Sequence, residues 1–113
     1  GVLSAASLRQ SASSASAPAR ALPAGGQLLS TTETTDGGRH ASTSVVASTA
    51  RPGEVVAFYR DHLVRNGWTL VRDTVAEGTP VLLLTRSGGR LDVVVSSLGG
   101  GSVAILNEVR GDE

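Results

Sequence analysis

One helix of this chain has recognisable ends and carries every aromatic residue, so it constrains the fold more than any other segment. It is predicted over residues 52–68, PGEVVAFYRDHLVRNGW. Pro52 suits the first helical position, where its missing N–H is not needed. Glu54 falls where a carboxylate can bond back to a free N–H of the first turn. The helix is expected to end at Asn66-Gly67, because Gly67 can adopt the left-handed conformation of a Schellman motif.

The apolar side chains of this helix recur at helical spacing and predict the face that it buries. Trp68 directly follows the glycine, where a Schellman motif packs a side chain back onto Leu63. The structural core is therefore expected to include Val55, Phe58, Tyr59, Leu63, Gly67 and Trp68.

Six further segments have the composition of β-strands and are separated by turns rich in glycine. Residues 27–35 and 40–49 flank Asp36-Gly37-Gly38 and predict a hairpin before the helix. The segments after the helix cover residues 69–75, 80–87, 90–97 and 102–110. The last two alternate between apolar and polar residues, which is typical of a sheet with one buried face. The predicted fold class is α+β in the order ββαββββ, an antiparallel sheet of five to six strands with one helix packed on one face.

The first 26 residues have a different composition, dominated by Ala and Ser and ending in Pro and Gly. Such a segment buries too little apolar surface to offset the entropy of ordering. We therefore expect a flexible linker or docking arm over residues 1–26 and a single domain over residues 27–113. No apolar run approaches the ~20 residues of a membrane span, and no intact signal peptide is evident. Any membrane attachment is expected through an upstream anchor.

Charge and composition argue against several classes of function. Ten arginines are balanced by ten acidic residues, so the chain lacks the basic surplus of a nucleic-acid-binding protein. There is no Cys, and the two histidines, His40 and His62, have no spacing typical of a metal site. A Ser-His-Asp set built on Asp61 and His62 is weakened because neighbouring residues of a helix point to different sides. We expect no catalytic residues, no metal and no cofactor, and therefore a protein that is not an enzyme.

The strands also carry aliphatic residues on the face that the helix is not expected to cover. Val81-Leu82-Leu83-Leu84 is apolar on both faces, and a helix of about 15 residues spans only roughly 22 Å. Two interpretations stay open: a contact surface for a partner, or the scattered aliphatic residues of any sheet. The candidate interface residues on this face are Leu82, Leu84, Val94 and Leu106, with Arg86 and Arg90 at the rim.

The stretch from Glu54 to Trp68 resembles a helix found in small bacterial cell-envelope domains. In those domains a Phe-Tyr…Leu…Gly-Trp helix, here Phe58, Tyr59, Leu63, Gly67 and Trp68, precedes a β-meander. The resemblance covers about residues 45–110. It implies an extracytoplasmic protein, periplasmic, at the cell surface or secreted, which is tethered to a membrane only if an upstream anchor exists.

Two functions are compatible with these features. The first is a non-enzymatic interaction or assembly module of a bacterial cell-envelope complex, which contacts a protein partner or a second copy of itself. The alternative is a domain that binds a small ligand, such as a lipid or a cell-wall fragment, between helix and sheet. This alternative predicts a cavity bounded by Tyr59, Trp68 and the inward Val and Ile residues.

Overall fold

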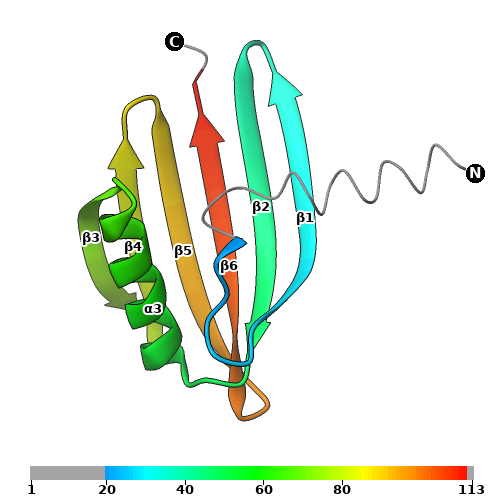
Figure 1. Cartoon of the computed structure of the whole chain (residues 1–113), viewed down its shortest axis with the longest axis vertical. Helices are drawn as coiled ribbons and strands as arrows, with labels where there is room; N and C mark the ends of the chain where they lie inside the picture. Colours follow the sequence, from blue (N-terminus) through cyan, green and yellow to red (C-terminus); the bar gives the residue numbers. More distant parts are fainter. Residues whose placement is uncertain (1–19, 112–113) are drawn as a thin grey trace, which may run out of the picture.

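A single antiparallel sheet with a helix on one face makes up the described part of the protein. The computed structural model describes residues 20–111. The elements are β1 (Gln27–Asp36), β2 (Arg39–Ser48), α3 (Pro52–Arg65), β3 (Thr69–Ala76), β4 (Thr79–Arg86), β5 (Gly89–Leu98) and β6 (Gly101–Arg110). The strands are arranged in the order β1-β2-β6-β5-β4-β3 (Figure 1). The last strand of the chain therefore lies in the middle of the sheet.

The predicted α+β class with the order ββαββββ is wrong as a description of this fold. Strand makes up 60% of the structure and helix 16%, so the molecule is mostly sheet. The strands do not lie in the sheet in the order in which they occur in the chain, because β6 enters between β2 and β5. That insertion depends on pairing between segments far apart in the sequence, which local composition and periodicity do not encode.

Both ends of α3 have the chemistry that the sequence indicates. At the start, the backbone N–H of Arg51 donates to Oε1 of Glu54 at 3.3 Å. At the end, the N–H of Trp68 donates to the carbonyl of Leu63 at 3.0 Å, and Gly67 has a φ of +96°. This is a Schellman motif, and it directs the chain from the helix into β3 with Trp68 turned inward.

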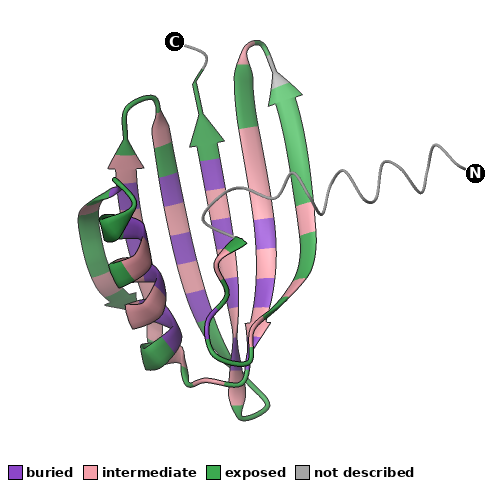
Figure 2. Ribbon diagram, viewed as in Figure 1, coloured by how far each residue is buried: buried purple, intermediate pink, exposed green. Residues whose placement is uncertain are grey.

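The hydrophobic core lies between α3 and the part of the sheet that the helix covers. The helix packs over β3, β4, β5 and β6, and the buried positions alternate along the strands beneath it (Figure 2). The core consists of Val46, Val55, Val56, Tyr59, Leu63, Trp68, Leu82, Leu84, Leu91, Val93, Val95, Ala104 and Leu106. Burial of each large aliphatic or aromatic side chain contributes about 1.5–3 kcal/mol to the hydrophobic stabilisation.

The strand register decides which residues face α3, on what we call the inner face of the sheet. Leu82 pairs with Val93, and Val93 pairs with Leu106. These residues are at most 1% exposed, as is Leu84. The prediction that Leu82, Leu84 and Leu106 form a surface on the opposite, outer face is therefore wrong. Residues 102–109 carry aliphatic side chains at both odd and even positions, so the sequence pattern does not show which set is buried. A shift of one residue moves every side chain of a strand to the other face of the sheet.

The outer face does carry an apolar row that crosses four strands. Val45 pairs with Ile105, Ile105 with Val94, and Val94 with Val81. All four residues are partly exposed. Of the predicted interface residues, Val94 thus lies on the outer face.

The chain before β1 is described from residue 20 onward. Residues 1–19 of the predicted linker or docking arm lie outside the described residues. Within residues 20–26, Pro23 is buried, and the carbonyl of Ala24 accepts a hydrogen bond from Oγ of Ser48 at 2.7 Å. On the neighbouring strand, Oγ of Ser102 donates to the carbonyl of Ala50 at 2.7 Å. These two hydrogen bonds hold the segment before β1 and the segment after β2 against the sheet.

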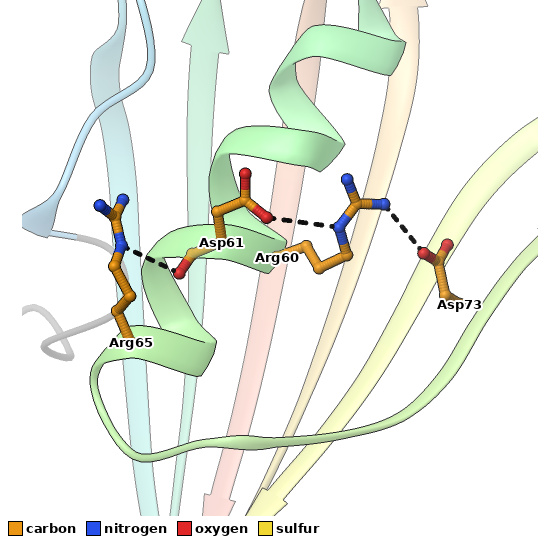
Figure 3. A network of polar contacts seen from close by, with 4 residues as sticks. All are labelled: Arg60, Asp61, Arg65 and Asp73. Carbon is orange, nitrogen blue, oxygen red and sulfur yellow. Dashed lines mark hydrogen bonds and ion pairs between the residues drawn. The ribbon is translucent and has the colours of Figure 1, made fainter.

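A polar network attaches α3 to the edge strand β3 (Figure 3). Nη1 of Arg60 lies 3.0 Å from Oδ2 of Asp73, and Nε of Arg60 lies 3.6 Å from Oδ1 of Asp61. Nε of Arg65 donates to the backbone carbonyl of Asp61 at 3.3 Å. The hydrogen bond to Asp73 raises the pKa of Arg60. Exposed pairs of this kind contribute little to stability.

Candidate functional site

The inner face has two halves with different chemistry. The apolar half is the core region of β3, β4 and β5 beneath α3. The polar half is formed by Thr31, Glu33, Thr35, His40, Ser42, Ser44, Glu108 and Arg110, on β1, β2 and the end of β6. One row of register partners crosses both halves, from Glu33 through Ser42 and Glu108 to Leu91 and Leu84.

A pocket of about 80 Å³ lies in the polar half, near the tip of the β1–β2 hairpin. It is lined by Glu33, Thr34, Thr35, His40, Ala41, Ser42, Glu108 and Arg110. The register places six of these residues in two adjacent rows of the inner face. Because the three strands are hydrogen-bonded along their length, these side chains project from a fixed backbone.

Glu108 is the buried charge of this pocket. Its side chain is only 5% exposed, and Oε2 lies 3.8 Å from Nε of Arg110, whose side chain is 60% exposed. Among residues 20–111, no hydrogen bond reaches the Glu108 carboxylate. Glu108 thus retains unused capacity to accept hydrogen bonds.

Ser42 contributes a second unsatisfied group to the pocket. Its Oγ atom is buried and has no hydrogen-bond partner within the described residues. Neighbouring polar groups do have partners: Oγ1 of Thr35 lies 3.2 Å from Nδ1 of His40, and Oγ1 of Thr31 lies 3.4 Å from Oγ of Ser44. Buried polar atoms in proteins are normally bonded. Among the residues that line the pocket and are described by the structure, the buried atom without a partner is therefore Oγ of Ser42.

Trp68 connects the pocket to the core. A β-carbon placed on Gly89 would lie 3.6 Å from Cγ of Arg110 and 3.7 Å from Cη2 of Trp68, so both side chains flank this glycine. The guanidinium of Arg86 lies 4.5 Å from the centre of the Trp68 ring, a cation–π distance. The fluorescence of Trp68, the single tryptophan of the chain, can therefore report on events at Arg110.

The cavity expected between Tyr59 and Trp68 is not where the pocket lies. Tyr59 is fully buried and Trp68 is 3% exposed, and both are packed in the core. Neither residue lines the pocket. The hydroxyl of Tyr59 is buried without a hydrogen-bond partner among the described residues, and this burial raises its pKa. The residues expected to bound that cavity are thus core residues between the helix and the sheet.

The remaining residues that the sequence singled out lie in the core or contact neighbouring side chains outside the pocket. Val55 and Leu63 are buried, and Phe58 is partly buried against the core. Nε of Arg90 lies 3.6 Å from Oδ1 of Asp92 on the outer face, apart from Arg86 at the Trp68 ring. Among the described residues, no cluster of His, Cys, Asp or Glu is arranged to hold a metal ion. Within that same part of the chain, none of the helices is long and apolar enough to cross a membrane.

Sequence reasoning did not identify the pocket residues as a group. A signal was present at Glu108, which shares its strand phase with Ala104 and Leu106. A charged residue in the buried phase of a strand is uncommon unless it is paired. The other set of alternate positions on this strand was expected to be buried, so Glu108 was not recognised as a buried charge. Ser42 had no distinguishing sequence feature.

Comparison with known proteins gave one match. A protein-family model described as START domain-like matches residues 28–107, from β1 into β6. No curated protein and no solved structure matched the chain.

Proposed function

The chain belongs to the START domain-like family, and from this membership we propose that it binds a small ligand in the polar half of its inner face. Membership favours the small-ligand-binding domain over the interaction module. The buried location of Leu82, Leu84 and Leu106 points the same way, because the interaction module relied on these residues as an outer contact surface.

The observation that carries the proposal is the polar lining of the pocket, where the buried Oγ of Ser42 has no partner among the described residues and faces the row that holds the Glu108 carboxylate. A buried polar group without a partner costs about 1–3 kcal/mol. That cost is recovered when a ligand supplies the missing hydrogen bonds, so such groups are favourable contacts for a ligand. Both groups line the same pocket, and strand pairing holds them in adjacent positions on β2 and β6.

The size of the pocket limits what it can hold. Its volume of about 80 Å³ is well below the roughly 300–1,000 Å³ of sites that enclose a drug-sized molecule. The pocket therefore takes a very small molecule, or one polar end of a larger molecule. No residue of α3 lines the pocket, and the core residues beneath the helix are buried.

The proposal can be tested with the single tryptophan and with thermal stability. Amines, carboxylic acids, sugars and short-chain lipids, each at millimolar concentration, would be screened for a change in Trp68 emission and in Tm. Ser42→Leu fills the pocket with an aliphatic side chain and should abolish any binding there. Ser96→Leu, on an exposed position of β5, is the matched control and should leave binding intact.

Two results would count against a ligand site in the polar half. One is a complete absence of binding across the panel. The other is binding that Ser42→Leu and Ser96→Leu leave equally unchanged, because the ligand would then occupy a different surface.

A further inference from the structure

We infer that the group held by the pocket is a primary ammonium, supplied by an amine ligand. This inference rests on the proposed function and adds the chemical class of the ligand. Three features of the pocket support it: the balance of charge, the kind of hydrogen-bonding atoms that lack partners, and the absence of an aromatic cage.

The charges lining the pocket favour a cation. Glu33 and Glu108 contribute two carboxylates and Arg110 contributes one guanidinium, and the imidazole of His40 also lines the pocket, with Nδ1 3.2 Å from Oγ1 of Thr35. Arg110 is 60% exposed and 3.8 Å from the carboxylate, so it neutralises Glu108 only in part. An anionic ligand would be repelled by both carboxylates, more strongly by Glu108, whose side chain is the more buried of the two.

Both groups, the Glu108 carboxylate and the Ser42 hydroxyl, can accept hydrogen bonds from donors on the ligand. An ionised carboxylate only accepts hydrogen bonds, and a serine hydroxyl can accept as well as donate. An ammonium group has three N–H donors around one small centre. It can therefore bond to both Glu108 and Ser42 within about 80 Å³, and hydrogen bonds between two charged groups are the stronger kind.

Other cations fit the lining less well. A quaternary ammonium has no N–H donor and is usually held by aromatic rings, whereas no Phe, Tyr or Trp lines this pocket. A metal ion needs several ligands in close array, and among residues 20–111 no group of three or more His, Cys, Asp or Glu side chains could hold one. A compact primary ammonium uses the available acceptors most completely.

The chain offers a matched control on the opposite face. Arg110 and Glu108 are two residues apart on β6, and Arg90 and Asp92 are two residues apart on β5, with Nε–carboxylate distances of 3.8 Å and 3.6 Å. The carboxylate of the second pair is on the outer face and is 34% exposed, against 5% for Glu108. The two pairs thus differ in burial and in access to the pocket rather than in type.

The experiment titrates the whole protein with butylamine at neutral pH, using Trp68 emission and calorimetry. Butanol, butyrate and tetramethylammonium serve as the uncharged, anionic and donor-free counterparts. Each counterpart should bind at least about tenfold more weakly than butylamine, since the missing charge-assisted hydrogen bonds are worth about 1.5–3 kcal/mol. Octylamine distinguishes two sources of the ammonium group. If octylamine binds more tightly than butylamine, the natural ligand is an amphiphile; if the two bind equally well, it is a soluble amine.

The variants give effects of opposite sign. Glu108→Gln keeps the shape of the side chain and should weaken butylamine binding by about tenfold. Arg110→Gln removes the competing cation and should strengthen binding by about threefold or more. Asp92→Asn should leave it unchanged. Circular dichroism shows whether each variant is folded. If Glu108→Gln does not fold, the expected gain with Arg110→Gln still tests the inference.

The outcomes separate this inference from the proposed function. Butyrate or butanol binding as tightly as butylamine overturns the ammonium assignment, as does an equal loss with Asp92→Asn and Glu108→Gln. If butylamine fails to bind while a different class of molecule binds in a manner blocked by Ser42→Leu, the ligand site stands and the ammonium assignment fails. If nothing binds, both fail.

Discussion

The apolar and polar halves of the inner face share one sheet and one set of register rows, yet they have opposite chemistry. Along a single row, Leu84 and Leu91 lie fully buried beneath α3, whereas Ser42 and Glu108 line a pocket in which Oγ of Ser42 has no partner among the described residues. The apolar half is completed by the protein itself, because the helix supplies its partner surface. The polar half has no such partner from α3, and this difference separates the part of the sheet that stabilises the fold from the part available to a ligand.

The largest effect is expected from truncating the apolar half. Leu84→Ala should lower the free energy of unfolding by about 2–5 kcal/mol, because it removes buried methyl groups and leaves a cavity. Urea unfolding followed by circular dichroism measures the change. Thr35→Ala, on an exposed position of the polar half, should stay within about 0.5 kcal/mol. Equal losses from the two variants would contradict the division into halves.

A smaller loss is expected where the polar side of β2 holds its flanking segments. Oγ of Ser48 donates to the carbonyl of Ala24 at 2.7 Å and accepts from the N–H of Ala50 at 3.0 Å. Ser48→Ala leaves both backbone groups without this partner and should cost about 1–3 kcal/mol in the same unfolding experiment. Ser97→Ala, at an exposed position of β5, is the control. A Ser48→Ala protein as stable as the parent would show that these bonds are replaced by water.

A gain in stability is expected from removing the buried hydroxyl of Tyr59 in the apolar half. Tyr59→Phe removes a buried hydroxyl that has no partner among residues 20–111, and should raise the free energy of unfolding by about 1 kcal/mol. Urea unfolding at neutral pH measures this gain. A loss instead of a gain would mean that the hydroxyl is bonded in solution.

The same hydroxyl predicts sensitivity to alkaline pH. Burial raises the pKa of Tyr59 in the folded state above the unfolded value of about 10. Above about pH 10 the unfolded chain ionises Tyr59 more readily than the folded protein does, so the free energy of unfolding falls as the pH rises from about 10 toward the folded-state pKa. Thermal unfolding measured at increasing pH should show a loss in the parent that is smaller in Tyr59→Phe. Parallel curves for the two proteins would contradict a neutral, buried Tyr59.

The smallest effect is expected at the boundary between the two halves. Arg86→Ala removes the guanidinium over Trp68 and should cost about 0.5–1 kcal/mol, with a measurable change in Trp68 emission. Arg90→Ala removes an exposed cation of the outer face and should leave that emission unchanged. If both variants alter the emission equally, Arg86 has no specific contact with the ring.

Several sequence-based expectations stay predictions. A location outside the cytoplasm and attachment through an upstream anchor derive from the helix resemblance, a protein partner or homo-oligomer from the aliphatic residues of the strands, and the lack of enzymatic activity from missing motifs. Fractionation of cells that produce the protein, together with the solution mass of residues 1–113, would check the location and the oligomeric state.

The part of this protein that the sequence by itself determined is local. The ends of α3 follow from Pro52, Glu54 and Gly67, and the strands lie between turns rich in glycine, because capping and turn conformation depend on a few neighbouring residues. Strand positions were accordingly predicted to within one or two residues.

Only the tertiary structure decided the order of strands, the face of β6 that is buried and the existence of the pocket. Both phases of β6 are rich in aliphatic residues, so its orientation depends on the partners Val93 and Ser44, which lie far away in the chain. The pocket likewise combines the hairpin at Glu33 and Ser42 with Glu108, more than sixty residues later. Such contacts form by long-range pairing, and a local pattern does not specify which distant segment a strand will meet.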